Sequence, residues 1–251
     1  ASVLTVTSNP GRTSPVKRGR YVLEQLRRRG IPCLDADALA WGDLSRFTTI
    51  MTGVRAYERR ADLRANNSRL LDYVEKGGTL IVQYNKFEFN QAQYGPYPAK
   101  VSSERVTDEF APVRTLDRDS PLFYTPNRVD ENTWKGWVQE RGLYFLGEKD
   151  PRYKDLVALD EPFAYNKGEK TGALVEAQYG KGRWVYVGLG LWRELPAGVD
   201  DRGVGGGVEV FPDRHHLVAE AQHVGAKCSV GVHHGAATDH RCHGHSFRLS
   251  N

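Results

Sequence analysis

Charged, amide and aromatic side chains gather in three short segments of this sequence, and these residues are the best suited to chemistry. Two of the segments directly follow predicted buried strands, and the third is a late loop. Their members are Arg55, Tyr57, Glu58 and Arg59; Asn85, Lys86, Glu88 and Asn90; and Trp192, Arg193 and Glu194. The carboxyl ends of parallel strands meet at one edge of an open α/β sheet, where ligands usually bind. We therefore expect the three segments to line one crevice.

The residue types in this crevice favour a small polar, carbohydrate-like ligand. Arginine and asparagine donate hydrogen bonds to hydroxyl groups, and aromatic rings stack on the apolar faces of sugars. The predicted ligand-binding residues are Arg55, Tyr57, Arg59, Asn85, Lys86, Asn90, Trp192 and Arg193. A competing interpretation is that the arginines and glutamates only pair with one another as surface ion pairs.

The glutamates allow a second kind of chemistry, which is hydrolysis of a glycosidic bond. Glu88 together with Glu58 or Glu194 could supply a general acid and a general base. Such a pair works when the two carboxyl groups lie about 5 to 9.5 Å apart, and the fold decides that distance. A glycosidase-type hydrolase is therefore the alternative to a non-catalytic binding domain.

The C-terminal segment differs in composition from the rest of the chain and offers a candidate zinc site. All eight histidines lie in it, and His243 and His245 could face the same way from a strand, with Cys242 as a further ligand. The segment lacks hydrophobic periodicity, which favours an irregular tail over a metal site. We predict no cofactor for the main domain, residues 1–198, and assign 199–251 to a separate tail rich in glycine and histidine.

The hydrophobic pattern predicts alternating strands and helices that would hold these segments in place. Apolar, β-branched runs predict strands and helical spacing predicts helices. The strands are expected at 2–7, 31–34, 48–52 and within 77–85, and the helices at 15–29 and 63–74. Short connections between such units produce right-handed crossovers and a parallel sheet. Two later runs, 173–177 and 183–187, flank a glycine-bearing turn and predict an antiparallel hairpin that extends the sheet.

Aromatic residues in the middle of the chain have two interpretations. Trp134 and Trp137 are three residues apart, which places both on one helical face. We favour two anchors of the core over a sugar-stacking platform. A strand is predicted at 142–146, and the loop at 94–98 is rigid and aromatic, a kind of loop that often shapes sites.

Composition describes a globular protein and argues against two classes of partner. Hydrophobic residues make up 39% and charged residues 26%, and no apolar run approaches the roughly 20 residues that span a bilayer. The net charge of +4 is small and the basic residues are dispersed, so we predict neither a membrane nor a nucleic acid as partner. The three cysteines form no disulfide framework, which fits a reducing compartment but leaves the localisation open. The only methionine is Met51, so we expect a processed product or a fragment of a longer protein.

Several stretches resemble the class I glutamine-amidotransferase-like domains, which have a flavodoxin-like fold. The similar stretches are Gly53–Tyr57, Leu71–Leu80, Tyr179–Arg183 and Val187–Gly190. They are most similar to the ThuA-like domain that follows the catalytic domain in many bacterial LmbE/PIG-L-type deacetylases. Over residues 1–198 the resemblance implies an α/β, flavodoxin-like three-layer sandwich with a mostly parallel central sheet and an antiparallel extension. It also implies a deacetylase domain as partner and, by analogy with trimerisation modules of glycosidases, a homo-oligomer.

Two departures from that family bear on activity. The amidotransferases place a nucleophilic cysteine on the sharp turn after the central strand, where this sequence has Tyr84, Asn85 and Lys86. They also use a late histidine, and no histidine precedes His215. Glutamine hydrolysis requires both groups, so we expect no glutaminase activity. The His-Pro-Asp-Asp zinc motif of the deacetylases is absent too, so deacetylation would belong to a partner domain.

Overall fold

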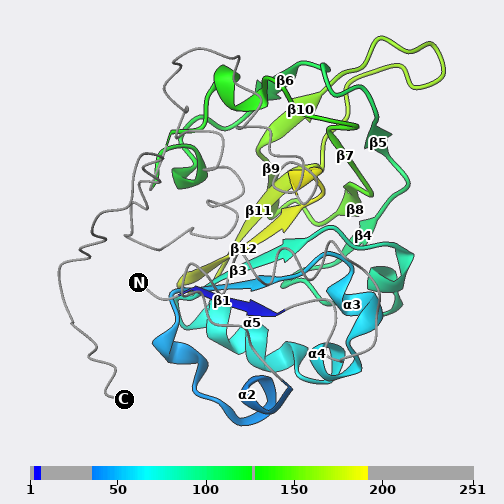
Figure 1. Cartoon of the computed structure of the whole chain (residues 1–251). Helices are drawn as coiled ribbons and strands as arrows, with labels where there is room; N and C mark the ends of the chain where they lie inside the picture. The colour runs from blue at the N-terminus through cyan, green and yellow to red at the C-terminus, as the bar shows by residue number, and fades with distance from the viewer. Residues whose placement is uncertain (1–2, 7–35, 126–127, 192–251) are drawn as a thin grey trace, which may run out of the picture.

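A mixed β-sheet forms the centre of the protein (Figure 1). The computed structural model describes residues 3–6, 36–125 and 128–191. Its main sheet has the strand order β1-β2-β3-β12-β11-β9. The strands span Val3–Val6, Thr49–Thr52, Thr79–Gln83, Gly182–Val187, Leu174–Tyr179 and Tyr153–Asp155 in that order. The pairs β1-β2, β2-β3 and β3-β12 are parallel, and β12-β11 and β11-β9 are antiparallel. The predicted α/β class with an antiparallel extension is confirmed.

Helices cover one face of this sheet. They are α2 (Ala36–Trp41), α3 (Ala56–Arg59), α4 (Ala61–Ala65) and α5 (Asn67–Glu75), with a 3₁₀ turn η1 at Leu44–Arg46 before β2. α5 packs on β3 and β12, and Gly77, with φ at 119°, follows its C-cap residue Lys76. The amides of Gly77 and Gly78 donate to the carbonyls of Val74 and Tyr73, which is a Schellman cap. This cap turns the chain directly into β3, as the glycine pair predicts.

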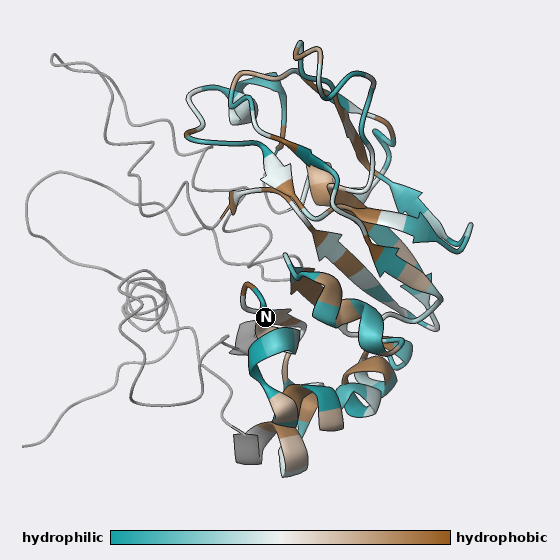
Figure 2. Cartoon of the chain, turned by 90° about the vertical axis from the view of Figure 1, so that its right-hand side faces the viewer, coloured by the Kyte–Doolittle hydropathy of each residue, from teal (hydrophilic) through white to brown (hydrophobic). Residues whose placement is uncertain are grey.

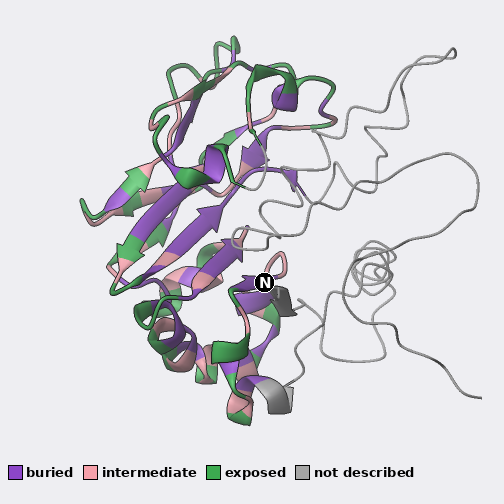
Figure 3. Ribbon diagram, turned by 90° about the vertical axis from the view of Figure 1, so that its left-hand side faces the viewer, coloured by how far each residue is buried: buried purple, intermediate pink, exposed green. Residues whose placement is uncertain are grey.

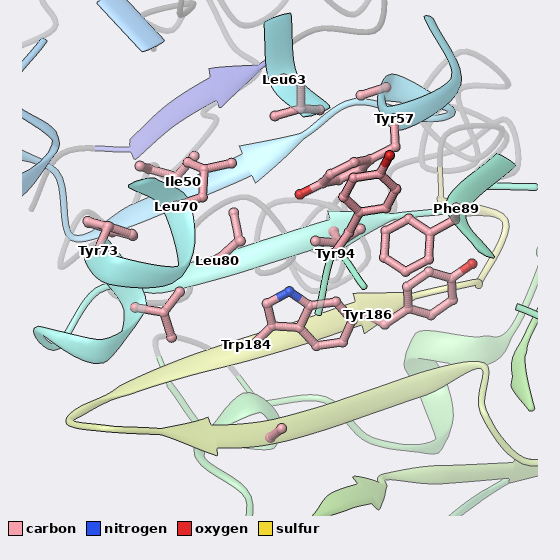
Figure 4. Packing of buried hydrophobic residues seen from close by; sticks show 14 of the residues in the cluster. Ile50, Tyr57, Leu63, Leu70, Tyr73, Leu80, Phe89, Tyr94, Trp184 and Tyr186 are labelled. Carbon is pink, nitrogen blue, oxygen red and sulfur yellow. The ribbon is translucent and has the colours of Figure 1, made fainter. Parts of the chain in front are cut away.

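The alternation of side chains along each strand divides the core into two layers. Ile50, Leu80 and Trp184 pack with the helices, and Met51, Ile81 and Val185 pack against the opposite side (Figure 4 shows the first layer). The central strands are therefore buried and apolar, while the outer loops are exposed and hydrophilic (Figures 2 and 3).

Short elements between β3 and β11 contribute to both layers of the core: Phe89, Val101 and Leu146 pack on the helix side, and Val106 and Val157 pack on the opposite side. The 3₁₀ turns are η2 (Phe87–Gln91), η3 (Pro121–Phe123) and η4 (Glu131–Trp134). Three two-stranded antiparallel sheets pair β4 with β8, β5 with β7 and β6 with β10. These strands span Ala99–Val101, Leu146–Lys149, Arg105–Val106, Gly142–Leu143, Val113–Thr115 and Val157–Leu159 in the order of the pairs. Among the described residues, no helix combines the length and apolar character needed to cross a bilayer.

The predicted hairpin at 173–187 is confirmed as β11 and β12. Gly180, with φ at 56°, lies in its turn, and the Lys181 amide donates to the Glu75 carbonyl at the end of α5. A Cβ at Gly180 would lie 2.4 Å from that carbonyl oxygen. The turn therefore needs glycine for its backbone angle and for its close approach to the helix.

Two predicted elements are split in the structure. The helix expected at 63–74 is interrupted at Asn66, which separates α4 from α5. The strand expected at 142–146 is two strands, β7 and β8, because Tyr144 takes a left-handed conformation with φ at 55°. The helix and strand expected at 15–34 lie outside the described residues.

Candidate functional site

The carboxyl ends of β2 and β3 lie side by side and are joined by hydrogen bonds. The Arg55 amide donates to the Tyr84 carbonyl at 2.7 Å, and the Tyr57 amide donates to Asn85 Oδ1 at 3.2 Å. The Asn85 amide group in turn donates to the Gln83 carbonyl at 2.8 Å. The two described segments of the candidate site therefore meet at one edge of the sheet.

Three charged residues after β2 form an ion-pair cluster. Arg55 donates twice to the Glu58 carboxylate, and Arg59 Nε lies 3.2 Å from the same carboxylate. The bond to Glu58 is the main cause of a raised pKa for Arg55. This is the arrangement of the competing interpretation, in which arginines and glutamates pair with each other. Glu58 has both oxygens engaged, so it offers little hydrogen-bonding capacity to a ligand or a leaving group.

Arg55 holds an unusual backbone conformation at this point. Its φ of 56° is left-handed, and it forms the N-cap position of α3 without a side-chain cap. Such a conformation costs on the order of 1 kcal/mol or more in a residue with a Cβ. The backbone hydrogen bond to Tyr84 and the two side-chain hydrogen bonds to Glu58 hold Arg55 in place.

Three of the predicted ligand-binding residues make structural contacts within the protein. Tyr57 is fully buried, donates to Asn67 Oδ1 at 2.7 Å and packs against Phe89 and Tyr94 (Figure 4). Asn85 is 1% exposed and is committed to the backbone bonds described above. Both side chains point into the protein, a direction that their position in the sequence did not reveal, and their roles as ligand contacts stay predictions.

Asn90 also bonds to the backbone. Its Nδ2 donates to the Val101 carbonyl and its Oδ1 accepts from the Val101 amide, both at 2.8 Å. This pair of bonds fastens η2 to β4. Asn90 is therefore better described as a clamp between two elements than as a ligand contact.

Lys86, Phe87 and Glu88 present the accessible part of the loop after β3. Lys86 Nζ lies 5.5 Å from the centre of the Tyr144 ring, and Phe87 packs edge-on against the same ring while remaining 52% exposed. Glu88 is half-buried, and its Oε2 is buried without a hydrogen-bond partner among the described residues. These side chains combine a cation, a carboxylate and an aromatic surface at the edge where α/β sheets bind ligands.

A group of tyrosines completes this edge and was not identified from the sequence. Tyr84 packs against Tyr144 with ring centres 5.4 Å apart, and Tyr186 donates to the Tyr144 carbonyl at 2.7 Å. Burial raises the pKa of Tyr84 to about 12, with a further contribution from Tyr144. Tyr84 stays protonated at neutral pH and remains a hydrogen-bond donor. The position of Tyr84 directly after β3 could have identified it as a site residue. Tyr144 is distant in the sequence, and no local pattern indicates that it lies at this edge.

The turn after β3 lacks the features of a nucleophile site. It carries no cysteine, and the described residues other than glycine with positive φ are Arg55, Gln139 and Tyr144. Neither Tyr84 nor Asn85 therefore sits on a strained turn of the kind that presents a nucleophile. Within the described ranges, no group of three or more metal-ligating residues comes together.

Other candidates from the sequence fall outside the described residues. These are Trp192, Arg193 and Glu194 of the late loop, and Cys242, His243 and His245 of the tail. Their ligand, catalytic and metal roles stay predictions.

The two tryptophans of the middle region are core residues, as we favoured. Trp134 and Trp137 are each 5% exposed, with ring centres 5.6 Å apart. Arg141 lies over the Trp137 ring and donates to the carbonyls of Ala111 and Trp134. A sugar cannot reach either ring face in this arrangement.

The topology and the edge geometry define the class of the protein. It has an α/β fold with a mixed six-stranded sheet, and a buried asparagine, Asn85, follows the central strand β3.

One solved structure has a similar fold, and two others show weaker similarity. The cytoplasmic protein STM3548 from Salmonella typhimurium is 12% identical, with a TM-score of 0.52, over 89% of this chain and 98% of that one. STM1381 from Salmonella typhimurium LT2 is 11% identical, with a TM-score of 0.48, over 89% and 99%. A GH42 β-galactosidase of G. stearothermophilus is 17% identical, with a TM-score of 0.41, over 80% of this chain and 30% of its own length. No protein-family model and no curated protein matches the chain.

Proposed function

We propose that the chain is a non-catalytic glutamine-amidotransferase-like domain that binds a small polar, carbohydrate-like ligand at the carboxyl edge of β2 and β3. The observation that carries the proposal is the loop after β3, where Lys86 and Phe87 converge on Tyr144. Lys86 has no salt bridge to a described residue, and Phe87 leaves half of its surface exposed. A sugar offers hydroxyl groups to the first and an apolar ring face to the second.

Isothermal titration with glucose, galactose, mannose and N-acetylglucosamine tests this proposal. We expect Phe87→Ala and Lys86→Ala each to weaken binding about tenfold, because one lost stacking contact or charged hydrogen bond is worth roughly 1–2 kcal/mol. Phe110→Ala is the matched control, since Phe110 is 76% exposed in a different loop. Absence of binding to every sugar in the panel would refute the proposal.

Docking to another protein domain is the second candidate, and an exposed aromatic pair favours it. The rings of Phe163 and Tyr165 are stacked 5.3 Å apart, and Tyr165 is 79% exposed. They lie in the loop between β10 and β11, which Glu161 and Asn166 fasten to the backbone at 105–108. Exposed aromatic residues on an ordered loop are common at interfaces.

The partner in this second proposal is a deacetylase domain, as the family resemblance implies, or another copy of the chain. Light scattering measures self-association, and we expect Tyr165→Ser to weaken any dimer or trimer. Tyr124→Ser is the matched control because Tyr124 is another exposed tyrosine, at 49%, and lies outside this loop. If the protein is a monomer at all concentrations, self-association is excluded and a deacetylase domain remains as the proposed partner. A co-purification assay with such a domain tests that partner directly.

Hydrolysis of a glycosidic bond remains the alternative activity. The paired oxygens of Glu58 are held by Arg55 and Arg59, which disfavours Glu58 as an acid or base. Glu88 and Glu194 are then the remaining pair. Activity on chromogenic glycosides that disappears in Glu88→Gln would support this alternative, and activity unchanged by that substitution would remove Glu88 from it.

A further inference from the structure

Three described carboxylates have a buried oxygen that accepts no hydrogen bond: Glu88 Oε2, Glu140 Oε1 and Asp155 Oδ1. Asp155 pairs with Lys149 through its other oxygen, and Glu140 also has a partner, whereas no hydrogen bond or salt bridge joins Glu88 to a described residue. Glu161 accepts from the amides of Thr107 and Asp108 at 2.6 and 3.0 Å, and Glu176 accepts from Ser120 at 3.1 Å. Glu88 Oε2 is equally removed from solvent but accepts no hydrogen bond. Buried polar atoms in folded proteins are almost always hydrogen-bonded, so this oxygen needs a donor other than the described residues, and a bound ligand is one such donor.

The nearest guanidinium group does not serve Glu88. Arg55 is close enough for Glu88 to contribute to its raised pKa, but its side-chain donors are directed to Glu58. Lys86, which precedes the η2 turn, lies over the Tyr144 ring. Neither neighbouring cation donates a hydrogen bond to Glu88 Oε2, so this oxygen keeps its accepting capacity.

The charges around this oxygen indicate which kind of donor it would accept. Arg55, Arg59 and Lys86 are positive. The negative residues are Glu58, Glu88 and Glu140, the last of which acts on the neighbouring Tyr84. Among the described residues these charges balance, three positive against three negative, so they favour neither an ammonium ion nor a phosphate. A neutral hydroxyl group is the donor that satisfies the carboxylate without introducing an unpaired charge.

We infer that Glu88 is the hydrogen-bond acceptor for a hydroxyl group of a neutral sugar or polyol bound at this edge. This inference rests on the proposed binding function and assigns the polar anchor of that site. The ring of the ligand would lie toward Phe87, the exposed aromatic residue one position earlier on the same turn. Glu88 would thus act in recognition, and no bond of the ligand is broken.

A binding experiment with a matched control tests the role of Glu88. Titration of the wild type, Glu88→Gln and Glu148→Gln is made with the sugar panel and with monodeoxy analogues of the sugar that binds best. Glu148 is an exposed glutamate whose side chain pairs with Lys100, far along the chain from η2. We expect Glu88→Gln to bind at least tenfold more weakly and Glu148→Gln to bind as the wild type does.

The deoxy analogues identify the contact itself. One analogue should bind the wild type at least tenfold more weakly than the parent sugar, and the same analogue and sugar should bind Glu88→Gln nearly equally. Sugar binding that is unchanged in Glu88→Gln overturns the inference while leaving the proposed function intact. Absence of binding in the wild type overturns both.

Thermal unfolding without ligand separates recognition from a structural role. If the role of Glu88 is to bind a ligand, its charge does not stabilise the ligand-free protein. The melting temperature of Glu88→Gln should then equal or exceed that of the wild type. A melting temperature lower by about 5 °C or more would mean that Glu88 stabilises the fold, and the inference would fail.

Discussion

Replacing Asn85 with alanine should destabilise the protein substantially, because this side chain joins the two strand ends that form the candidate site. Asn85 is 1% exposed, its Oδ1 accepts from the Tyr57 amide, and its Nδ2 donates to the Gln83 carbonyl. The substitution leaves both backbone groups buried without a partner. Each such group costs about 1–3 kcal/mol, so we expect a loss of roughly 3 kcal/mol and at most about 6 kcal/mol.

The loss can be measured by urea unfolding followed by circular dichroism. A decrease of roughly 3 kcal/mol corresponds to a melting temperature about 6–12 °C lower in a domain of this size. The slope of the free energy against urea should stay the same, because the buried surface of the folded state is unchanged.

Asn132→Ala is the matched control for this experiment. Asn132 is exposed, and its side chain accepts one hydrogen bond, from Lys135. We expect this variant to lie within about 0.5 kcal/mol of the wild type. If Asn85→Ala were equally mild, the hydrogen bonds between β2 and β3 would not hold the edge together, and the description of Asn85 as a structural residue would be refuted.

Three further predictions concern residues outside this edge. Hydrogen bonds outweigh burial and hold the pKa of Glu161 below its ordinary value of 4.5, so its contribution to stability is complete above that pH and disappears as pH falls through the folded-state pKa. The stability difference between wild type and Glu161→Gln, measured by urea unfolding, should therefore shrink below about pH 4.5. Gly180→Ala should lower the unfolding free energy by about 1–3 kcal/mol, because of its positive φ and the approach of Glu75. Arg141→Met should unfold at lower urea concentration, since the carbonyls of Ala111 and Trp134 lose their donors.

The strands of the main sheet could be predicted where apolar or alternating residues mark them within a few consecutive positions. β2, β3, β11 and β12 all lie within or next to the ranges expected from apolar and alternating residues. The glycines at 77 and 180 marked a helix end and a hairpin turn, since few other residues adopt those backbone angles. Elements whose form depends on distant contacts were not predictable, such as the break at Tyr144 between β7 and β8.

The candidate site was only partly predictable for the same reason. The sequence placed Arg55 and Asn85 directly after predicted strands, and the structure shows that these strand ends are neighbours. The sequence did not distinguish side chains that face the core from those that face solvent. Tyr57 and Asn85 point inward because their hydrogen-bond partners and aromatic neighbours lie there. Arg55 and Glu58 meet because α3 places them three residues apart on one turn.

The amino-acid sequence by itself determined the class of fold, the order of its strands along the chain and the absence of a cysteine at the turn after β3. These features depend on local periodicity and residue identity, which any reader of the chain can follow. Tertiary structure alone decided that Tyr144 reaches Lys86 and Phe87, and that Glu88 keeps one oxygen buried without a donor. Such facts arise from packing between segments more than fifty residues apart, and no local pattern encodes the direction in which a side chain finally points.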